Sequence, residues 1–380
     1  MRPFTFNPGP RLLAGPDQAQ ALAEKLPPGP CLLVTDADLI RLGLPDAYRS
    51  GIGASRKVIL FDRVEADPSK ETLLAATEDG RVAGVTSVVG FGGGSPMDVA
   101  KLAAYLLGSG DELDGIWGVG IATGERLPLA LVPTTAGTGS EATPISVITC
   151  EGGVKLAVNS PPLIADWAVL DATLTLALPQ HVTAATGIDA IVHAVEAYTS
   201  ARLKNPLSDA LAREALRLLT SNLLPAIQQP GNVDARSAML LGAHLAGLAF
   251  SNAPVAGVHA LAYPLGGLHH LPHGLTNALM LRHVLGHNLE AARELYAELA
   301  EIIEPDCAGQ GSQARAALLI ERLDQLARSS GLPLRLRDHG VEFDEAPVLA
   351  REAMRQTRLL VNNPCEISES DAQRLYEAAW

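Results

Sequence analysis

The chain has 380 residues, a length at which two domains of roughly 150 to 200 residues each are expected rather than one larger core. Hydrophobic residues make up 47% of it, and its formal net charge at pH 7 is −13. Because a negative surface repels phosphate backbones and anionic lipids, nucleic-acid and membrane binding are disfavoured, and small-molecule chemistry fits better.

The cysteines and the N-terminal stretch indicate the cellular compartment. Four cysteines, Cys31, Cys150, Cys307 and Cys365, are too widely spaced for a CxxC pair and too few for a disulfide scaffold. The stretch MRPFTFNPGPRLLAG contains no apolar signal-peptide core, and no segment reaches the ~18 uninterrupted apolar residues of a membrane span. We therefore expect a protein of the reducing cytoplasm.

The first half of the chain alternates short apolar, β-branched runs with helix-like stretches. The runs are CLLVTDAD (31–38), KVILFDRV (57–64), VTSVVGFGGG (85–94) and LPLALVPTT (127–135). Such alternation predicts a parallel sheet with crossover helices, and near-continuous apolar strands agree because parallel strands are covered on both faces. Residues 1–179 are therefore expected to form an α/β domain.

From about residue 180 the pattern changes to long amphipathic segments without a clear strand between them. They include LSDALAREALRLLTSNLLPAI (207–227), LEAARELYAELAEII (289–303), QARAALLIERLDQLA (313–327) and SESDAQRLYEAAW (368–380). We expect an all-helical second domain over residues 180–380, with the boundary near Pro179. A cleft between the two domains is the expected site of chemistry.

A glycine-rich turn follows the third predicted strand. Gly92, Gly93, Gly94 and Ser95 open a helix, SPMDVAKLAAYLL (95–107), for which Ser95 is the predicted N-cap. The glycines let the backbone approach a ligand closely, and the helix N-terminus offers free N–H groups to a pyrophosphate. The alternative interpretation is a tight strand-to-helix turn without a ligand.

Two further features fit a nucleotide site. The loop PTTAGTGSEAT (133–143) carries hydroxyl groups that can bind phosphate, ribose or a nicotinamide amide. Asp36 ends the strand CLLVTD, where a carboxylate can accept hydrogen bonds from ribose hydroxyls and repels a 2′-phosphate, which favours NAD over NADP. The alternative role for Asp36 is a helix N-cap, for which Asp38 competes.

The histidines are clustered: seven of the ten lie between His244 and His287. Just upstream, Asp189 and His193 stand four residues apart on one predicted helix face, a spacing that suits one shared ion but is more often an ordinary intrahelical contact. His259 and His273, within GVHALAYPLGGLHHLPHG (257–274), make four ligands from three chain segments feasible.

The remaining histidines of the cluster offer alternatives. His283 and His287 form a second helical pair and are the rival ligand set, although no carboxylate lies nearby to complete it. His269 and His270 are adjacent and cannot easily both face one ion, so one of them is expected to line the pocket. His244 lies in an apolar helix and is expected to be a core residue.

Long motifs occur in a fixed order along the chain: GGGSPMDVAK (92–101), PTTAGTGSEAT (133–143), SPPLIADWAVLD (160–171), GIDAIVHAVEAYTS (187–200), GVHALAYPLGG continuing to PHG (257–274), and NNPCEISESDAQRLYEAA (362–379). In these motifs the chain resembles the iron-containing (group III) alcohol dehydrogenases over nearly its whole length. The resemblance implies a Rossmann-like N-terminal domain and an all-helical C-terminal domain, the fold shared with dehydroquinate synthase. It also implies NAD and a catalytic metal at the domain interface, usually Fe(II) and sometimes Zn(II).

The resemblance also implies roles for individual residues. The metal ligands would be Asp189, His193, His259 and His273. The nucleotide contacts would be Asp36, Gly93, Gly94, Ser95, Asp98, Thr134, Thr135 and Thr138, with Lys155 near the phosphates or nicotinamide and with Pro68 and Ser140 as weaker assignments.

The chain departs from the family pattern at two positions. Tyr263 stands where many members have a histidine that is often assigned to proton relay or substrate contact, and Cys365 stands where members commonly have arginine. The catalytic candidates are therefore Tyr263 and His270. The proton would leave through Tyr263, a neighbouring histidine, the ribose hydroxyl or water, and the sequence does not choose among these routes.

The resulting hypothesis is reversible hydride transfer between NAD(H) and a small alcohol or its aldehyde or ketone, with a metal that lowers the pKa of the alcohol. A homodimer or larger homo-oligomer is expected. One rival is a maleylacetate reductase, a related metal-free enzyme that usually carries asparagine at the position of Asp189. The other rivals are a dehydroquinate-synthase-like lyase, which uses NAD only transiently, and a non-catalytic nucleotide-binding protein.

Overall fold

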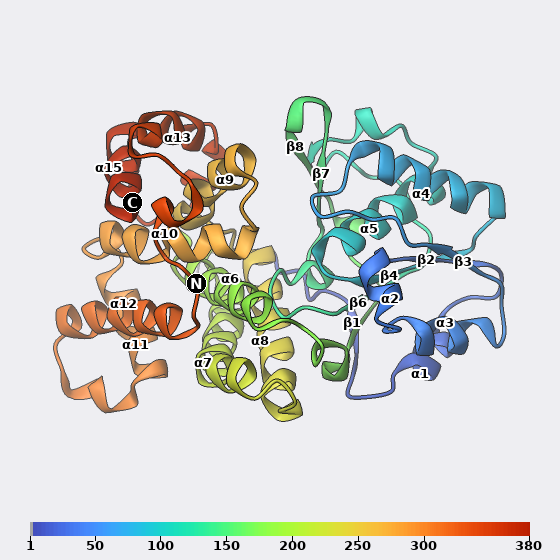
Figure 1. The fold of residues 1–380 in the computed structure, drawn as a ribbon, viewed down its shortest axis with the longest axis horizontal. Coiled ribbons are helices and arrows are strands. Elements are labelled where there is room, and N and C mark those ends of the chain that lie inside the picture. The colour runs from blue at the N-terminus through green and yellow to red at the C-terminus, as the bar shows by residue number, and fades with distance from the viewer. Residues whose placement is uncertain (1–2) are drawn as a thin grey trace. The chain divides into compact units, whose positions relative to one another are not determined.

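A computed structural model of the protein describes residues 3–380, and the described chain divides into two compact units. The first is Pro8–Leu176, and the second combines the described residues up to Asn7 with Ala177–Trp380. The first unit is α/β and the second is helical, so the predicted fold class is confirmed (Figure 1). The sequence places the change near Pro179, and the structure divides the chain after Leu176.

A six-stranded parallel sheet forms the centre of the α/β unit, in the order β1-β9-β6-β4-β2-β3. Its strands are β1 (Arg11–Ala14), β2 (Cys31–Val34), β3 (Val58–Phe61), β4 (Ser87–Gly92), β6 (Leu129–Pro133) and β9 (Trp167–Leu170). All four predicted runs are strands of this sheet. Each strand is short because its apolar run is ended by Thr, Asp, Gly or Pro within a few residues.

Helices cover both faces of this sheet, with α4 and α5 on one face and α1 and α3 on the other (Figure 1). The helices of the unit are α1 (Ala19–Lys25), α2 (Ala37–Arg41), α3 (Asp46–Gly53), α4 (Lys70–Ala83) and α5 (Gly94–Ser109). Successive strand side chains point to opposite faces. Leu32 and Val88 accordingly belong to the core under α4 and α5, whereas Leu33 and Val89 belong to the core under α1 and α3. Burial on both faces explains why these strands are apolar throughout.

A second, three-stranded sheet has the order β5-β8-β7. Its strands are β5 (Gly118–Val119), β7 (Ile145–Thr149) and β8 (Lys155–Asn159), with β7 and β8 antiparallel. The sequence did not predict this sheet, nor strands β1 and β9. The residues of β1, RLLA, are mostly exposed and contain only three consecutive apolar residues, too few to signal a strand.

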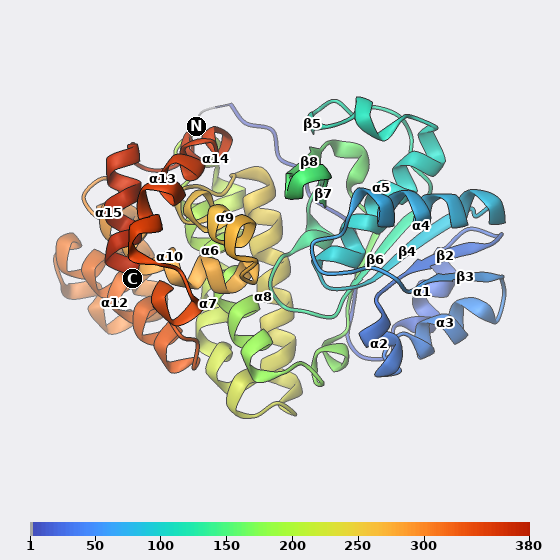
Figure 2. The ribbon, with the colours of Figure 1, turned by 45° about the horizontal axis from the view of Figure 1, so that its top comes forward.

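The helical unit is built from α6 to α15, and no strand occurs among its described residues. The helices are α6 (Gln180–Thr199), α7 (Pro206–Gln228), α8 (Val233–Asn252), α9 (Gly257–His269), α10 (His273–Asn288), α11 (Arg293–Ile303), α12 (Ser312–Ser329), α13 (Ala346–Met354), α14 (Thr357–Leu360) and α15 (Glu369–Ala379). Helices α6, α7 and α8 pack side by side in both views (Figures 1 and 2). Fifteen of the 20 residues of α6 are buried, including Asp189 and His193, so this helix lies at the centre of the unit.

Among the described residues, no single helix is long and apolar enough to cross a membrane. The pair α8 and α9, bent by 105°, meets that criterion by length and composition only. Both helices are largely buried within the helical unit.

Candidate metal centre and nucleotide loops

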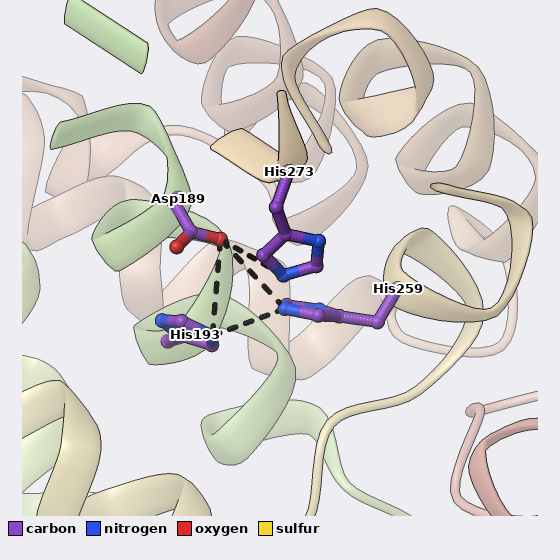
Figure 3. Close-up of side chains that lie close together, drawn as sticks. All are labelled: Asp189, His193, His259 and His273. Carbon is purple, nitrogen blue, oxygen red and sulfur yellow. Dashed lines mark hydrogen bonds and ion pairs between the residues drawn. The ribbon is translucent and has the colours of Figure 1, made fainter. Parts of the chain in front are cut away.

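Four side chains from three helices of the helical unit converge on one point (Figure 3). Asp189 and His193 lie four residues apart on α6, His259 lies near the start of α9, and His273 is the first residue of α10. Their ligand atoms all lie within 4.8 Å of one another. The structure therefore brings together the four residues predicted to bind a metal.

The distances within this group suit a single divalent cation. Asp189 Oδ1 lies 3.8 Å from the Nε2 atoms of His193 and His259 and 3.7 Å from Nε2 of His273. Ligand atoms about 2.1 Å from a tetrahedral ion are roughly 3.4 Å apart, so small adjustments place all four on one ion. One carboxylate and three imidazoles are donors that suit Fe(II) and Zn(II).

The approach of two imidazoles also favours a cation. Nε2 of His193 and Nε2 of His259 are 3.0 Å apart, and the two rings stack with their centroids 4.7 Å apart. A neutral imidazole carries a lone pair on one ring nitrogen, and two facing lone pairs repel each other unless a proton or a cation lies between them. A divalent ion held by both nitrogens removes this repulsion.

Asp189 is prepared to carry negative charge. Its burial alone would raise its pKa, but the three facing imidazoles and a hydrogen bond from Asn277 outweigh burial and lower the pKa of Asp189 below its usual value. The carboxylates that bind metals do so in the ionised form. The site is therefore electrostatically complementary to a cation.

Local backbone features bring the three helices together. Gly274, the second residue of α10, packs so closely on α6 that a Cβ atom there would lie 2.4 Å from the backbone oxygen of Ala185, one turn before Asp189. Glycine therefore lets α10 begin close enough to α6 for His273 to reach the carboxylate. The Gly in the PHG motif has a packing role.

Three neighbours of the site were not predicted. Oε2 of Glu196 forms a hydrogen bond of 2.7 Å with Nδ1 of His259. Asn277 Nδ2 donates a hydrogen bond of 2.6 Å to Asp189 Oδ1. The ring of Phe250 stacks on that of His193, with ring centroids 4.4 Å apart. Helical spacing could have indicated two of them, because Glu196 follows Asp189 by seven residues and Asn277 follows His273 by four. Nothing in the sequence marks Phe250.

Asn277 lies against several ligand atoms at once. Besides Asp189, its Nδ2 lies 3.2 Å from Nε2 of His259 and 3.3 Å from Nε2 of His273. Its own Oδ1 is buried without a hydrogen-bond partner. The amide thus faces the triangle formed by one carboxylate oxygen and two imidazole nitrogens.

Access to the site is on the side of His273. The side chains of Asp189, His193 and His259 are at most 5% exposed, whereas that of His273 is 39% exposed. The ring of Tyr263, one of the two catalytic candidates, lies with its centroid 5.7 Å from that of His273. His270, the other candidate, is exposed and forms the left-handed C-cap of α9.

The other histidines of the cluster lie outside this group. Within residues 3–380 the one grouping able to hold a metal is the predicted quartet, so the rival pair His283 and His287 is not supported. Nε2 of His287 instead lies 3.0 Å from the backbone oxygen of Glu366, and His269 faces Glu345 at 3.4 Å. His244 is buried on α8, as expected of a core residue.

In the α/β unit the two predicted nucleotide loops lie against each other. A Cβ atom at Gly94 would lie 3.2 Å from Thr138, and one at Gly93 would lie 3.6 Å from Thr135. The amide of Thr134 donates to the backbone oxygen of Gly92, which ties the second loop to the end of β4. The glycines thus leave a space beside the threonine hydroxyls that larger residues would fill.

Helix α5 begins earlier than predicted. Its N-cap is Gly93, which is two residues before Ser95, and Gly93 makes no side-chain cap hydrogen bond. The prediction of Ser95 as the cap was wrong, because the helical conformation already starts at Gly94. The helix thus starts without a capping side chain, which leaves its first N–H groups available to an anion.

Asp98 and Ser140 belong to a buried network around Lys101. Lys101 Nζ donates to Ser140 Oγ at 2.7 Å and to the backbone oxygen of Ile145 at 2.6 Å, and Ser140 Oγ donates to Asp98 at 2.6 Å. Burial lowers the pKa of Lys101 to about 8 and raises that of Asp98. The network fixes the position of the loop 133–143 relative to α5.

The other nucleotide candidates have structural partners. Asp36 caps α2 by accepting a hydrogen bond from the amide of Leu39 at 2.9 Å, and burial raises the pKa of Asp36. Lys155 pairs with Asp67 at 2.7 Å, next to Pro68, whose backbone oxygen accepts from the amide of Thr149. The capping role considered for Asp36 is therefore present, and a ribose contact by the same carboxylate stays a prediction.

Comparison with known proteins defines the class of enzyme. A family model described as iron-containing alcohol dehydrogenase matches residues 9–172, and a model of the C-terminal part of the Fe-containing alcohol dehydrogenase family matches residues 183–380. The chain is thus an oxidoreductase, and the predicted class of alcohol dehydrogenase is confirmed. It belongs to the iron-containing alcohol dehydrogenase family.

Individual relatives agree over nearly the full length. Long-chain-alcohol dehydrogenase 1 of Geobacillus thermodenitrificans is 38% identical over 353 residues, which cover 92% of this chain and 89% of that protein. Sulfoacetaldehyde reductase of Bilophila wadsworthia is 34% identical over 350 residues, 91% of this chain and 90% of that protein. Among solved structures, a 1,3-propanediol oxidoreductase superposes with a TM-score of 0.96 at 34% identity and covers 100% of both chains.

The packing at Gly274 gives a test of how the site is built. We predict that the added methyl group of Gly274→Ala forces α10 away from α6. Such overpacking should lower the free energy of unfolding by about 1–3 kcal/mol. The shift of α10 should also weaken metal binding at least severalfold. The measurements are denaturant unfolding and metal titration of the purified protein. Gly286→Ala on the same helix is the control, because a Cβ atom there meets nothing within 4 Å and alanine favours the helix. Equal metal affinity in both variants would contradict this account of the motif.

Proposed function

We propose that this enzyme interconverts a small alcohol and its aldehyde or ketone, using NAD(H) and one divalent ion held by Asp189, His193, His259 and His273. The observation that carries the proposal is the convergence of these four ligand atoms. When bound, such an ion supplies Lewis acidity that polarises the substrate oxygen and lowers the pKa of the alcohol. Fe(II) is the proposed metal, with Zn(II) as the alternative.

The residues of the site would divide the remaining work. His273 lies at the exposed side of the quartet, so substrate would enter past it and past the neighbouring ring of Tyr263. Phe250 and the buried α6 keep water away from the inner side of the site. The phenol of Tyr263 is a candidate to hold the hydroxyl group of the substrate and to receive or pass on its proton. His270 is a second candidate for this transfer.

The α/β unit would bind NAD through its glycine turn and threonine loop. The free N–H groups at the start of α5 and the hydroxyls of Thr135 and Thr138 suit a pyrophosphate, and Gly93 and Gly94 leave room for it. A similar solved structure, a sulfoacetaldehyde reductase from Bifidobacterium kashiwanohense, is a complex with NAD+ at 27% identity and a TM-score of 0.89. Ser95, Asp98, Thr134, Ser140, Lys155 and Pro68 complete the proposed contact set.

The substrate class is a small alcohol or aldehyde. The relatives carry names that range from long-chain-alcohol and 1,3-propanediol dehydrogenases to a sulfoacetaldehyde reductase. Aromatic residues are 4% of this chain, which favours an aliphatic pocket wall. The four cysteines are free, which fits the proposed reducing cytoplasm, and light scattering would test the proposed homo-oligomer.

The rival reactions are distinguished by one residue and one assay. A carboxylate at position 189 surrounded by imidazoles suits a cation, which argues against a metal-free reductase. A lyase regenerates its NAD in every turnover, whereas an alcohol dehydrogenase accumulates NADH. Net NADH formation with a panel of alcohols, with Fe(II) and with Zn(II), therefore separates the two.

Removing one imidazole tests the metal's role. We predict that His259→Ala and His273→Ala abolish metal-dependent turnover, because three ligands hold the ion too weakly. The NAD affinity should stay within about threefold of the wild type, since the proposed nucleotide residues lie in the α/β unit. The measurements are steady-state NADH formation and NAD binding by calorimetry. His283→Ala, in the rival pair, is the matched control and should retain activity. Loss of activity in His283→Ala alone would overturn the ligand assignment.

Asp36 provides a test of cofactor choice. We predict that Asp36→Asn raises the kcat/KM ratio of NADP to NAD by roughly tenfold or more, since it removes the charge that repels a 2′-phosphate while asparagine still caps α2. Asp38→Asn is the control, because that exposed carboxylate pairs with Arg41 instead of capping the helix. An unchanged NADP to NAD ratio in Asp36→Asn would show that the carboxylate serves only as a cap.

A further inference from the structure

The structure assigns Glu196 as a positioning residue of the metal centre: we propose that its carboxylate holds the ring of His259 in the tautomer whose Nε2 lone pair faces the other ligands. This inference rests on the proposed function, because it concerns the same site. It adds a residue that does not touch the ion and that the comparisons do not identify.

The contacts of Glu196 are specific and buried. The residue is 3% exposed, and its Oε2 atom lies 2.7 Å from Nδ1 of His259. The same Oε2 accepts a hydrogen bond from the amide of Ala256 at 3.0 Å, and Oε1 accepts one from the amide of Val258 at 2.6 Å. Two backbone donors and one imidazole nitrogen from one turn of chain thus converge on one carboxylate.

The chemistry of the pair determines the tautomer. A carboxylate has no proton to donate, so the hydrogen bond requires that Nδ1 of His259 carries the N–H. The neutral ring then keeps its lone pair on Nε2, which lies 3.0 Å from Nε2 of His193 and 3.8 Å from Asp189 Oδ1. An anionic partner also makes the opposite nitrogen a stronger donor to a metal.

The competing explanation is that Glu196 only stabilises the start of α9. Its two backbone hydrogen bonds do satisfy free N–H groups there. However, a second side chain has the same structural role: Asn363 Oδ1 accepts a hydrogen bond from the amide of Gly257, the first residue of α9. Asn363 has no hydrogen bond to the ring of His259. Substituting Asn363 therefore tests the role at the helix start alone, whereas substituting Glu196 also affects the orientation of His259.

Glutamine at position 196 keeps the size of the side chain but replaces one oxygen by a donor. If that amide group faces His259, it binds the Nδ1 lone pair and favours the tautomer whose Nε2 carries a proton, which cannot bind a metal. We expect Glu196→Gln to weaken Fe(II) or Zn(II) binding by about 10–100-fold, the usual loss when such a partner is removed. Chelator competition on the apo-protein measures this affinity without any assay of turnover.

The control variant is Asn363→Ala. It should lower the unfolding temperature, because it removes a buried hydrogen bond at the same helix start, and should leave metal affinity within about threefold of the wild type. Equal losses of metal affinity in the two variants, or wild-type affinity in Glu196→Gln, would reduce Glu196 to a helix cap and overturn the proposal.

A measurement on the unaltered protein keeps the test independent of how the variants fold. Nitrogen-15 NMR of histidine-labelled apo-protein reports which ring nitrogen of His259 is protonated, with His259→Gln identifying the signal. The proposal expects the proton on Nδ1, and a proton on Nε2 overturns it. The tautomer is observed without metal or substrate, so a wild-type protein that oxidises no alcohol would refute the proposed function and leave this result standing.

Discussion

The approach of one buried carboxylate and three imidazole nitrogens is the interaction on which the helical unit's chemistry depends. Oδ1 of Asp189 lies within 3.8 Å of all three Nε2 atoms, and two of those nitrogens are 3.0 Å apart. Lone pairs at such distances repel one another unless a proton or a cation lies between them. The geometry therefore favours a shared cation, which is the property expected of a metal site that the surrounding helices hold in place.

The surrounding fold supplies the rigidity that such a site requires. Helix α6 provides Asp189 and His193 from its buried face, Gly274 allows α10 to start against α6, and Glu196 connects α6 to the first turn of α9. Each of the three helices that carry the four residues is therefore tied to another by backbone contact or by a buried side chain. Some of the residues that make these contacts, such as Gly274 of the PHG motif, are visible in the sequence motifs. Their packing role is seen only in the structure.

Much of this could be predicted from the sequence because it depends on local patterns. Apolar runs that end in Gly, Pro or Asp gave the four central strands, and the long amphipathic segments are helices. The alternation of strands with helices and the resemblance to the family were enough for the fold class. The resemblance also indicated the four residues that the structure brings together. The strands β1 and β9 were missed because their place in the sheet depends on pairing between Arg11–Ala14 and Trp167–Leu170, which are distant in the chain.

The supporting residues were missed for a different reason. Glu196 and Asn277 lie at helical spacings from Asp189 and His273, but polar residues at such spacings are common. Only the packing of α9 and α10 against α6 shows what the two side chains contact. The start of α5 was misplaced by two residues, because serine is the commoner cap, whereas the helix here already begins at Gly94 with Gly93 as an N-cap that has no side-chain hydrogen bond. The nucleotide contacts stay predictions.

The most direct test is anomalous diffraction from crystals of the protein grown anaerobically with Fe(II), recorded on both sides of the iron absorption edge. We expect one strong peak per chain, about 2.0–2.3 Å from Asp189 Oδ1 and from Nε2 of His193, His259 and His273. A peak at His283 and His287, or no peak among the four residues at saturating metal, would contradict it.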